Sequence, residues 1–321
     1  MLPERCGPRG ARPLLGMGHR RLRICCQDVS VSGLAVDPSE LVALLAAYDR
    51  QLRTEAEVAT ATRVDRDGPL FRACFGHGRG FVTYRDLDGF DKPADGPRLD
   101  SLIERTIDFF VRDTDVTEME WKTRGHDKPA DLVTRLLARG LVPDERETVM
   151  IGTCASLDRP VEVPPGVRVR RLGVDEHGGP LPVEQVRSDL ARALTMQARV
   201  FGDDGGIGLD ELLVSVLDPG RLLEFWVVDL VKPPADPTVL CAGRLEIVPG
   251  TSFAGLWGGA TVPDWRGRGL YRALTAARAR SAMARGATWL HSDSTEMSRP
   301  ILERAGLIPV TTTTPFMWHR H

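Results

Sequence analysis

The amino-acid sequence predicts a mixed α/β protein made of two similar halves. Apolar residues recur at helical spacing in some segments and alternate in others, and the two patterns follow one another along the chain. A proline-rich stretch without an apolar period covers residues 156–166 and separates the halves. The halves also end alike, because Leu137–Pro143 has the sequence LARGLVP and Glu303–Pro309 has ERAGLIP. We therefore expect the duplication of a whole domain rather than a short structural repeat.

Length and composition exclude several classes of protein. At roughly 150 residues per domain, 321 residues favour two domains. The 42% hydrophobic and 27% charged residues are typical of a globular protein, and no run approaches the ~20 apolar residues of a membrane span. The formal net charge of −2 gives no overall field that would attract nucleic acid or an anionic membrane. Six cysteines are too few for a disulfide framework, so we expect reduced thiols and a cytoplasmic protein.

We divide the chain into four parts. Residues 1–30 are predicted to be a disordered leader, or an over-extended start with Met17 as the true one, because arginines are interspersed there with proline and glycine. A transit peptide fits this charge pattern, but the prolines and glycines break an amphipathic helix. Residues 31–155 are predicted to form a first domain, 156–166 a linker and 167–321 a second domain.

The first domain is predicted to contain three helices and four strands. Asp37 caps the first helix, Pro38 occupies its first turn and Glu40 follows three residues after the cap. The third helix stops at Gly140. The loop Gly76–Gly80 resembles a phosphate cradle, but it leads into a strand and not a helix, so we interpret it as a hairpin turn. The predicted helices span 38–52, 99–111 and 130–139, and the strands span 71–75, 81–84, 117–122 and 148–151.

The second domain is predicted to contain more elements than the first. Their order is strand, two helices, three strands, helix, strand, helix and a final strand region. The predicted strands span 167–172, 222–230, 239–248, 254–262, 288–292 and 308–318, and the helices span 183–201, 210–217, 269–285 and 298–305.

The most informative stretch is the loop that joins a strand ending at Val262 to a helix beginning at Gly269. Glycine at 267 and 269 frees successive backbone N–H groups of side-chain bulk, so these groups can converge on an anion at the helix N-terminus. Three side chains add positive charge where a pyrophosphate would bind, namely Arg266, Arg268 and Arg272. The loop lacks the Gly-Lys-Ser/Thr of a Walker loop and does not satisfy the dinucleotide fingerprint Gly-x-Gly-x-x-Gly.

This stretch resembles the GNAT superfamily of acyl-CoA N-acetyltransferases. The signature of that family is Arg/Gln-x-x-Gly-x-Gly/Ala on a strand–loop–helix unit, and residues 266–271 match all but the last position, where Tyr271 replaces a small residue. The order of elements from 166 to 319 is also similar to that of the family. The first half resembles the same fold in outline but has no such loop. We therefore expect two tandem GNAT-like folds, the first of them degenerate.

The resemblance implies that the second domain binds acetyl-CoA as a co-substrate and needs no metal. It implies direct attack of an amine on the thioester, with both substrates held side by side. Gly258 and Gly259 suit a strand that splays to admit the thioester, or a β-bulge. The residues implied to bind acetyl-CoA are Arg266, Gly267, Arg268, Gly269, Leu270, Tyr271 and Arg272, with the backbone N–H groups of Ala260 and Thr261 on the preceding strand.

The resemblance also implies a general base, for which the strand 254–262 offers no Glu, Asp or His. Glu246, near the end of the preceding strand, and Asp293, just past the next one, are our candidates; each has the alternative of a solvated or salt-bridged carboxylate. Ser298 is a candidate proton donor to the leaving thiolate, in place of a tyrosine that family members often carry, or else a helix cap. We interpret His291, which lies on a strand, as a packed core histidine.

The sequence therefore predicts an N-acetyltransferase that moves an acetyl group from acetyl-CoA to a primary amine of a small molecule or peptide. Tandem GNAT proteins of about this size include mycothiol synthases, which acetylate a cysteinyl amine, and this is a narrower possibility. The alternative is a non-catalytic acyl-CoA-binding or regulatory protein, which Tyr271 and the acid-free strand favour. The acceptor amine and the oligomeric state stay open, and we expect no nucleic-acid or membrane partner.

Overall fold

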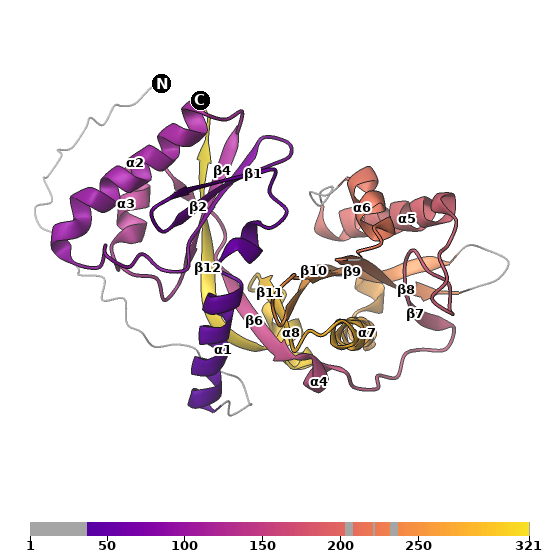
Figure 1. The fold of residues 1–321 in the computed structure, drawn as a ribbon. Coiled ribbons are helices and arrows are strands. Elements are labelled where there is room, and N and C mark those ends of the chain that lie inside the picture. Colours follow the sequence, from indigo (N-terminus) through magenta and orange to yellow (C-terminus); the bar gives the residue numbers. More distant parts are fainter. Residues whose placement is uncertain (1–36, 203–207, 221, 232–236, 321) are drawn as a thin grey trace, which may run out of the picture. The chain divides into compact units, whose positions relative to one another are not determined.

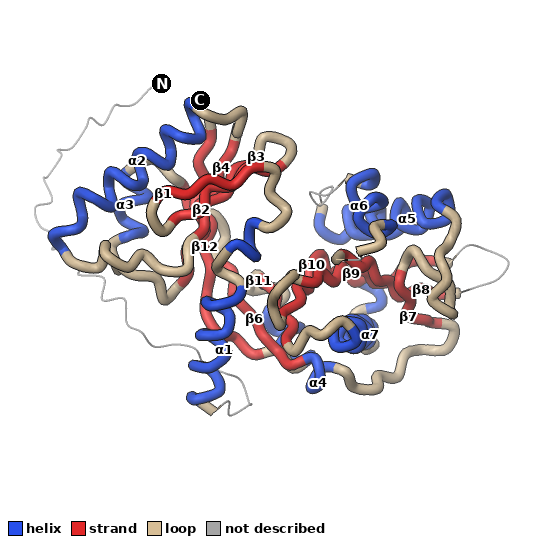
Figure 2. The backbone as a smooth tube through the Cα atoms, viewed as in Figure 1, coloured by secondary structure: helices blue, strands red, loops and turns tan. Residues whose placement is uncertain are grey.

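One mixed sheet of twelve strands runs through the protein, with helices packed on both of its faces (Figures 1 and 2). The computed structural model describes residues 37–202, 208–220, 222–231 and 237–320, so the predicted leader 1–30 lies outside the described residues. The strand order is β1-β2-β3-β4-β12-β6-β11-β10-β9-β8-β7, and β5 pairs with β12 beside this path. The predicted α/β fold class is confirmed.

The elements follow the predicted order closely. The helices are α1 (Pro38–Gln51), α2 (Gly96–Arg112), α3 (Leu132–Ala138), α4 (Cys154–Leu157), α5 (Val183–Phe201), α6 (Leu209–Leu217), α7 (Leu270–Ala284) and α8 (Arg299–Ala305). The strands are β1 (Arg63–Asp67), β2 (Leu70–Phe75), β3 (Arg79–Thr83), β4 (Glu118–Arg124), β5 (Val142–Pro143), β6 (Glu147–Thr153), β7 (Val167–Arg171), β8 (Leu223–Leu230), β9 (Thr238–Ile247), β10 (Phe253–Thr261), β11 (Trp289–Ser294) and β12 (Ile308–His319).

Local chemistry explains where α1 begins and how β2 and β3 are joined. The Asp37 side chain accepts a hydrogen bond of 2.9 Å from the Ser39 N–H, and Pro38 follows the cap, as predicted. Strands β2 and β3 pair antiparallel, and the turn between them places His77 and Gly78 at positive φ. The glycine loop is therefore a hairpin turn and not a phosphate site, which confirms that interpretation.

The two halves exchange strands. Strand β12, the last of the chain, pairs antiparallel with β4 over Thr313–His319 and with β6 over Ile308–Thr313. Strand β6, from the first half, pairs in turn with β11 from the second half. Each half therefore completes the other's part of the sheet. The domain boundaries 31–155 and 167–321 stay a prediction. They divide the sequence into two ranges, whereas strands from both ranges belong to one sheet.

Helices on opposite faces of the sheet build separate cores. Helices α5 and α6 pack on β8 and β9 through Leu190, Leu212 and Phe225. Helix α7 packs on the other face. Helix α1 lies over β6, β10 and β12, where Tyr48 and Phe253 belong to one buried cluster. A helix from the first half thus covers strands from both halves.

Three short elements were not predicted, namely β1, α4 and the two-residue strand β5. Strand β1 has the sequence RVDRD, and its only large apolar side chain, Val64, is 44% exposed. It therefore shows no buried face from which a strand could be recognised. The single-turn helix α4 extends into the start of the predicted linker, where the Thr153 hydroxyl accepts a hydrogen bond of 3.1 Å from the Ser156 N–H.

Candidate functional site

Strands β10 and β11 diverge in the middle of the sheet. They pair in parallel only from Phe253 opposite Trp289 to Gly255 opposite His291. The Ser292 hydroxyl donates to the Leu256 carbonyl over 2.9 Å, one residue beyond this pairing on each strand. Beyond this point the pairing of β10 with β9 shifts register between Trp257 and Ala260, and Gly258 has φ 60°. The structure thus has both the splay and the bulge that the paired glycines suggested.

The antiparallel ladder decides which backbone groups of β10 face the open side. The Val262 N–H donates to the Leu240 carbonyl of β9 over 2.9 Å. Because N–H groups alternate in direction along a strand, the N–H of Ala260 also faces β9, while that of Thr261 faces away from it. Of the two predicted backbone donors, Thr261 lies on the open edge and Ala260 does not.

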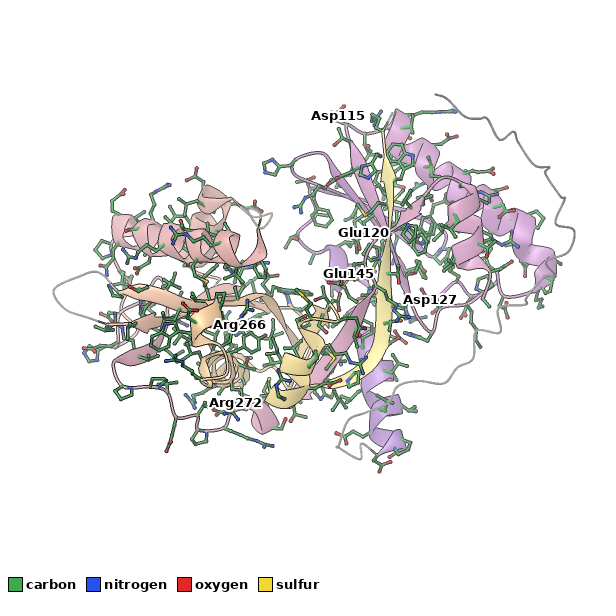
Figure 3. The ribbon with its side chains drawn as sticks, turned by 180° about the vertical axis from the view of Figure 1, so that it is seen from behind. Asp115, Glu120, Asp127, Glu145, Arg266 and Arg272 are labelled. Atoms are coloured by element: carbon green, nitrogen blue, oxygen red, sulfur yellow. The ribbon has the colours of Figure 1, made fainter. Side chains whose placement is uncertain are left out.

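The predicted cationic loop follows directly. Gly267 and Gly269 have φ of 74° and 79°, conformations that side chains disfavour. The first bond of α7 runs from the Ala273 N–H to the Gly269 carbonyl over 2.9 Å, so the preceding N–H groups project from the helix N-terminus. Arg266 and Arg272 lie at this end of α7 and are exposed (Figure 3). The loop therefore combines free amides, a helix dipole and positive charge, which together suit an anion.

Other residues hold the loop in place. The Arg266 Nε donates to the Thr261 carbonyl over 3.2 Å, and the Arg268 guanidinium stacks 4.7 Å from the centre of the Trp265 ring. Leu270 is buried beneath the helix. A Cβ on Gly269 would lie 3.3 Å from the Glu162 carbonyl oxygen, so the predicted linker packs against the loop.

Tyr271 points inward and leaves the anion-facing side of the loop open. Its ring lies under β10, where a Cβ on Gly259 would be 2.7 Å from Cε2 and 3.1 Å from the hydroxyl oxygen. The Arg278 guanidinium lies 5.6 Å from the ring centre. The departure from the family signature therefore fills space between α7 and β10 rather than space at the helix N-terminus.

The three candidate catalytic residues are not brought together. Glu246 lies on β9 opposite Gly255, is 36% exposed, and accepts from the Arg244 Nε over 3.1 Å. Asp293 lies on β11, beyond β10, and is 6% exposed. The Ser298 hydroxyl donates to the Thr295 carbonyl over 3.2 Å, and it makes no side-chain cap for α8.

Asp293 belongs to a group of four buried or half-buried ions that we call the charge cluster: Glu57, Lys122, Arg124 and Asp293. The Lys122 ammonium lies 2.7 Å from Asp293 Oδ2 and 3.7 Å from Glu57 Oε1, and Arg124 donates to the same Glu57 oxygen. Burial acts to raise the pKa of Asp293, but Lys122, His291 and Arg124 together outweigh it and hold that pKa below its usual value. Asp293 is therefore ionised and paired.

His291 is the core histidine that the sequence suggested. It is 8% exposed, and its ring meets those of Phe253 and Trp257 edge-on at 6.0 and 5.4 Å. Burial lowers its pKa to about 4, so the imidazole is neutral at pH 7. Its Nδ1 is buried and has no hydrogen-bond partner in the described part of the chain.

Sequence reasoning missed two acids near the charge cluster. Glu120 on β4 and Glu147 on β6 are half-buried, and within the described ranges neither makes a hydrogen bond or an ion pair. Burial, reinforced by the charge of Asp293, raises the pKa of Glu147 to about 7, and burial also raises the pKa of Glu120. The available signal was an acid within or at the start of a buried strand. Such an acid does not by itself show which strands lie next to it.

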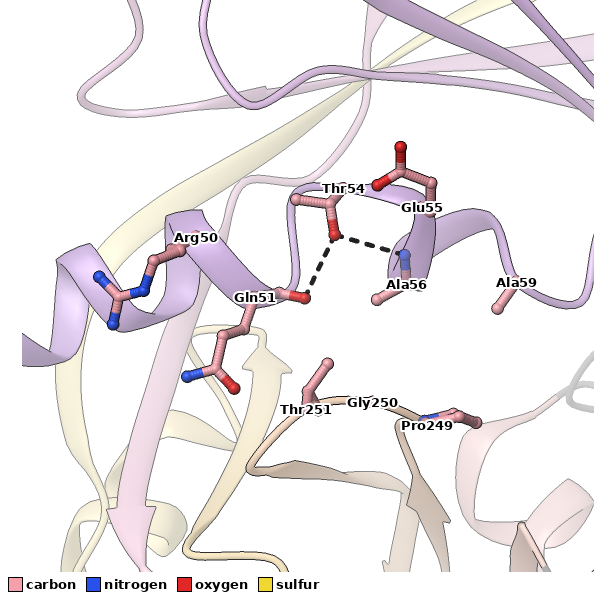
Figure 4. A pocket seen from close by; sticks show the side chains of 9 residues that line it. All are labelled: Arg50, Gln51, Thr54, Glu55, Ala56, Ala59, Pro249, Gly250 and Thr251. Atoms are coloured by element: carbon pink, nitrogen blue, oxygen red, sulfur yellow. Dashed lines mark hydrogen bonds between the residues drawn. The ribbon is translucent and has the colours of Figure 1, made fainter.

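Two open cavities lie away from these groups. One, of about 350 Å³, lies between the end of α1 and the β9–β10 turn and is lined by residues such as Gln51, Thr54 and Thr251 (Figure 4). The other, of about 370 Å³, is lined by residues that include Arg171, Glu224 and Arg285. Neither is lined by the cationic loop or by the open edge of β10.

The part of the chain that the structure describes contains neither a membrane-spanning helix nor a group of metal ligands. None of the helices placed by the structure is long and apolar enough to cross a bilayer. Across the same ranges, no three His, Cys, Asp or Glu side chains are grouped so that they could hold a metal ion.

Comparison with known proteins shows the fold. No family model matches the sequence, and no curated protein is similar to it. A GCN5-related N-acetyltransferase from Kribbella flavida is similar in structure, with a TM-score of 0.53, 17% identity, and 87% of this chain and 94% of that one covered. A tandem GNAT protein from the clavulanic acid biosynthesis pathway has a TM-score of 0.53 and 13% identity, over 79% and 81% of the two chains. A GCN5-related N-acetyltransferase from Sphaerobacter thermophilus has a TM-score of 0.52 and 14% identity, over 78% and 76%.

Proposed function

We propose that this chain, whose fold is that of the GNAT N-acetyltransferases, moves an acetyl group from acetyl-CoA to a primary amine of a small molecule or peptide. The observation that carries the proposal is the open edge of β10, which leads directly into the cationic loop at the N-terminus of α7. The edge of β10 offers backbone N–H groups to the extended arm of acetyl-CoA. The N-terminus of α7 offers N–H groups and positive charge to its pyrophosphate.

The donor groups of the loop suit the phosphates of acetyl-CoA. The backbone N–H groups from Gly267 to Arg272 would hold them, together with the exposed guanidinium groups of Arg266, Arg268 and Arg272. Leu270 and Tyr271 contribute through their backbone, because their side chains pack inward. When bound, acetyl-CoA supplies a thioester that an amine can attack.

The open edge of β10 would orient that thioester. The Thr261 N–H is available there. Because the pairing shifts register between Trp257 and Ala260, the alternation cannot be carried back to Gly259, and we propose the Thr261 N–H as the backbone donor in place of Ala260. Donors fixed in a strand cost no reorganisation when negative charge develops on a carbonyl oxygen.

Among the three candidate catalytic residues, we propose Glu246 as the general base. Both carboxylates have an ion-pair partner, Arg244 for Glu246 and Lys122 for Asp293, but Asp293 is only 6% exposed. The Ser298 hydroxyl already donates to a backbone carbonyl. Glu246 is the most exposed of the candidate carboxylates, and it lies opposite Gly255, close to where β10 opens. A water molecule could carry the ammonium proton to it.

The first test is calorimetric titration of acetyl-CoA into the full-length protein. The wild type is expected to bind, and the double variant Arg268→Gln/Arg272→Gln to bind on the order of a hundredfold more weakly, because two charge-assisted bonds are lost. Arg304→Gln removes an exposed charge from α8 and is the matched control. Absence of binding by the wild type would contradict the proposal. We avoid Gly269, where positive φ and the contact with Glu162 would strain any side chain.

Release of CoA thiol with a panel of amines then separates transfer from simple binding. A cysteinyl amine belongs in the panel because mycothiol synthases acetylate one. Glu246→Gln is expected to lower turnover while leaving acetyl-CoA affinity unchanged. Binding without thiol release beyond background hydrolysis would favour the alternative of a non-catalytic acyl-CoA-binding or regulatory protein.

A further inference from the structure

The cavity of about 370 Å³ lies far from the cationic loop. It is bounded by the end of β7, the start of β8, the loop before β8 and the last turn of α7. Because a helix rises about 1.5 Å per residue, the part of α7 at the cavity lies about 20 Å from Leu270, where the helix begins. The volume is within the range of small-molecule sites. The cavity is therefore separate from the groups proposed to bind acetyl-CoA.

A buried carboxylate, that of Glu224, fixes the side chains around this cavity. The Glu224 side chain is 2% exposed, and its Oε1 accepts from the Arg171 Nη1 over 2.9 Å. Its Oε2 accepts from the Trp226 Nε1 over 2.9 Å and from the Ser281 hydroxyl over 2.7 Å. The Arg285 Nη1 lies 3.7 Å from Oε1. Both oxygens of Glu224 are thus occupied, so this residue orients its neighbours and leaves the binding of a ligand to them.

Two guanidinium groups share this one carboxylate. The side chains of Arg171 and Arg285 are 21% and 24% exposed, so both charges are largely removed from water. Asp218, in the loop before β8, is exposed and accepts the Gly220 N–H over 3.0 Å, and it forms no ion pair with either arginine. Two positive charges and one negative charge therefore line the cavity, which leaves it with a net charge of +1.

Each arginine also keeps N–H groups that no described residue uses. Arg171 donates only from Nη1, so its Nε and Nη2 make no hydrogen bond within the described ranges. Arg285 donates from Nη2 to the Gly220 carbonyl over 2.9 Å, and its Nε makes no hydrogen bond to the same part of the chain. A guanidinium presents its donors in a planar fork that matches the two oxygens of a carboxylate. The cavity thus has both the charge and the donors to hold a carboxylate.

We propose that this cavity binds a small organic carboxylate between Arg171 and Arg285. One carboxylate would bring the net charge to zero, whereas a phosphate group carries about −1.5 to −2 at pH 7 and would leave an excess of negative charge. Pro219 and Ala284 line the same cavity and supply apolar contacts for the body of the ligand. The site uses no residue proposed to bind acetyl-CoA or to accept a proton, so this inference goes beyond the proposed function and does not depend on it.

The first test compares an acid and an alcohol of equal chain length. Calorimetry measures the binding of hexanoate and of hexanol to the full-length protein, and inorganic phosphate is the third probe. We expect hexanoate to bind at least about tenfold more tightly than hexanol, because only the acid can pair with the arginines. Equal affinity for the two, absence of hexanoate binding, or tighter binding of phosphate than of hexanoate would each overturn the proposal. This comparison needs no variant.

Variants then locate the bound carboxylate. Arg171→Gln and Arg285→Gln are each expected to weaken hexanoate binding about tenfold, because each removes one charge-assisted hydrogen bond, and thermal melting confirms that the variants fold. Arg280→Gln is the matched control: its side chain, also on α7, is 65% exposed and pairs with Asp158. This control should bind hexanoate as the wild type does. Unchanged affinity in both folded cavity variants would place the carboxylate elsewhere and overturn the proposal.

Titration of hexanoate in the presence of excess CoA separates this cavity from the cationic loop. The affinity for hexanoate is expected to stay unchanged, because the cavity and the start of α7 lie at opposite ends of the helix. Displacement of hexanoate by CoA would place the carboxylate at the loop, which overturns this inference and keeps the transferase. Hexanoate binding in a protein that does not bind acetyl-CoA would contradict the transferase and keep the carboxylate site.

Discussion

Burial acts on His291 and Glu147 in opposite senses. Both side chains belong to the face that carries the charge cluster, where losing water penalises the charged form. The imidazole loses its proton more easily and the carboxylic acid keeps its own, so their pKa values become about 4 and about 7. At neutral pH this face of the sheet thus holds a neutral histidine and a partly protonated glutamic acid.

His291 should make the protein sensitive to mild acid. Between its ordinary pKa of 6.5 and its folded pKa of about 4, the unfolded imidazole takes up a proton that the folded one does not. The free energy of unfolding should therefore fall as the pH falls through this range, by up to roughly 3 kcal/mol for this group.

Urea unfolding at pH 7 and at pH 5 checks this prediction. His291→Phe keeps the aromatic packing against Phe253 and Trp257, and it should lose less stability between the two pH values than the wild type. His319→Phe, at an exposed histidine, is the control. The same loss in the wild type and in His291→Phe would mean that another group is responsible.

At the scale of elements, β10 and α7 fit together through one glycine and one tyrosine. The ring of Tyr271 occupies the space that a side chain at Gly259 would need. The sequence showed both residues but gave no sign that they meet, because this contact depends on how far α7 is rotated against the strand. The pair explains how an aromatic residue is accommodated at a signature position that usually holds a small one.

Gly259→Ala should therefore destabilise the protein. The new Cβ would lie 2.7 Å from Tyr271 Cε2, closer than carbon atoms pack, and the overpacking should cost about 1–3 kcal/mol of unfolding free energy. In a Tyr271→Leu background the same change should cost clearly less, which a double-mutant cycle in urea measures. Gly76→Ala, at a glycine with open space around it, is the control. Equal costs in both backgrounds would show that the two residues do not interact.

At the scale of the whole molecule, the exchange of β6 and β12 joins the halves. Strands β4 and β6 precede the linker in the sequence and β11 and β12 follow it, and β6 pairs with β11 while β12 pairs with β4. Lys122 on β4 and Asp293 on β11 add a half-buried ion pair between the halves. The charge cluster lies on this junction, so side chains of both halves meet there.

Cutting the linker should not separate the halves. With a protease site inserted between Arg159 and Pro160, which are exposed, the two fragments should co-elute on size exclusion after cleavage and melt in one transition. Backbone ladders on both sides of β6 and β12 remain intact after the cut. Two separate peaks, or two melting transitions, would contradict this picture of a shared sheet.

The sequence by itself determined the order of elements and the cationic loop. Both depend on neighbouring residues: Asp37 and Pro38 start a helix, and Gly267 and Gly269 permit positive φ before α7. Such preferences act within a few residues, so they can be recognised without knowing the fold.

Only the tertiary structure decided which side chains face one another. The alternation of side chains along β4, β6 and β11 would be the same whichever strands were neighbours, so nothing local places Lys122 against Asp293 or Glu147 beside both. The direction of the Ala260 N–H likewise depends on the ladder with β9. The cationic loop thus depends on neighbouring residues, whereas the charge cluster is formed by pairing between strands that lie far apart in the chain.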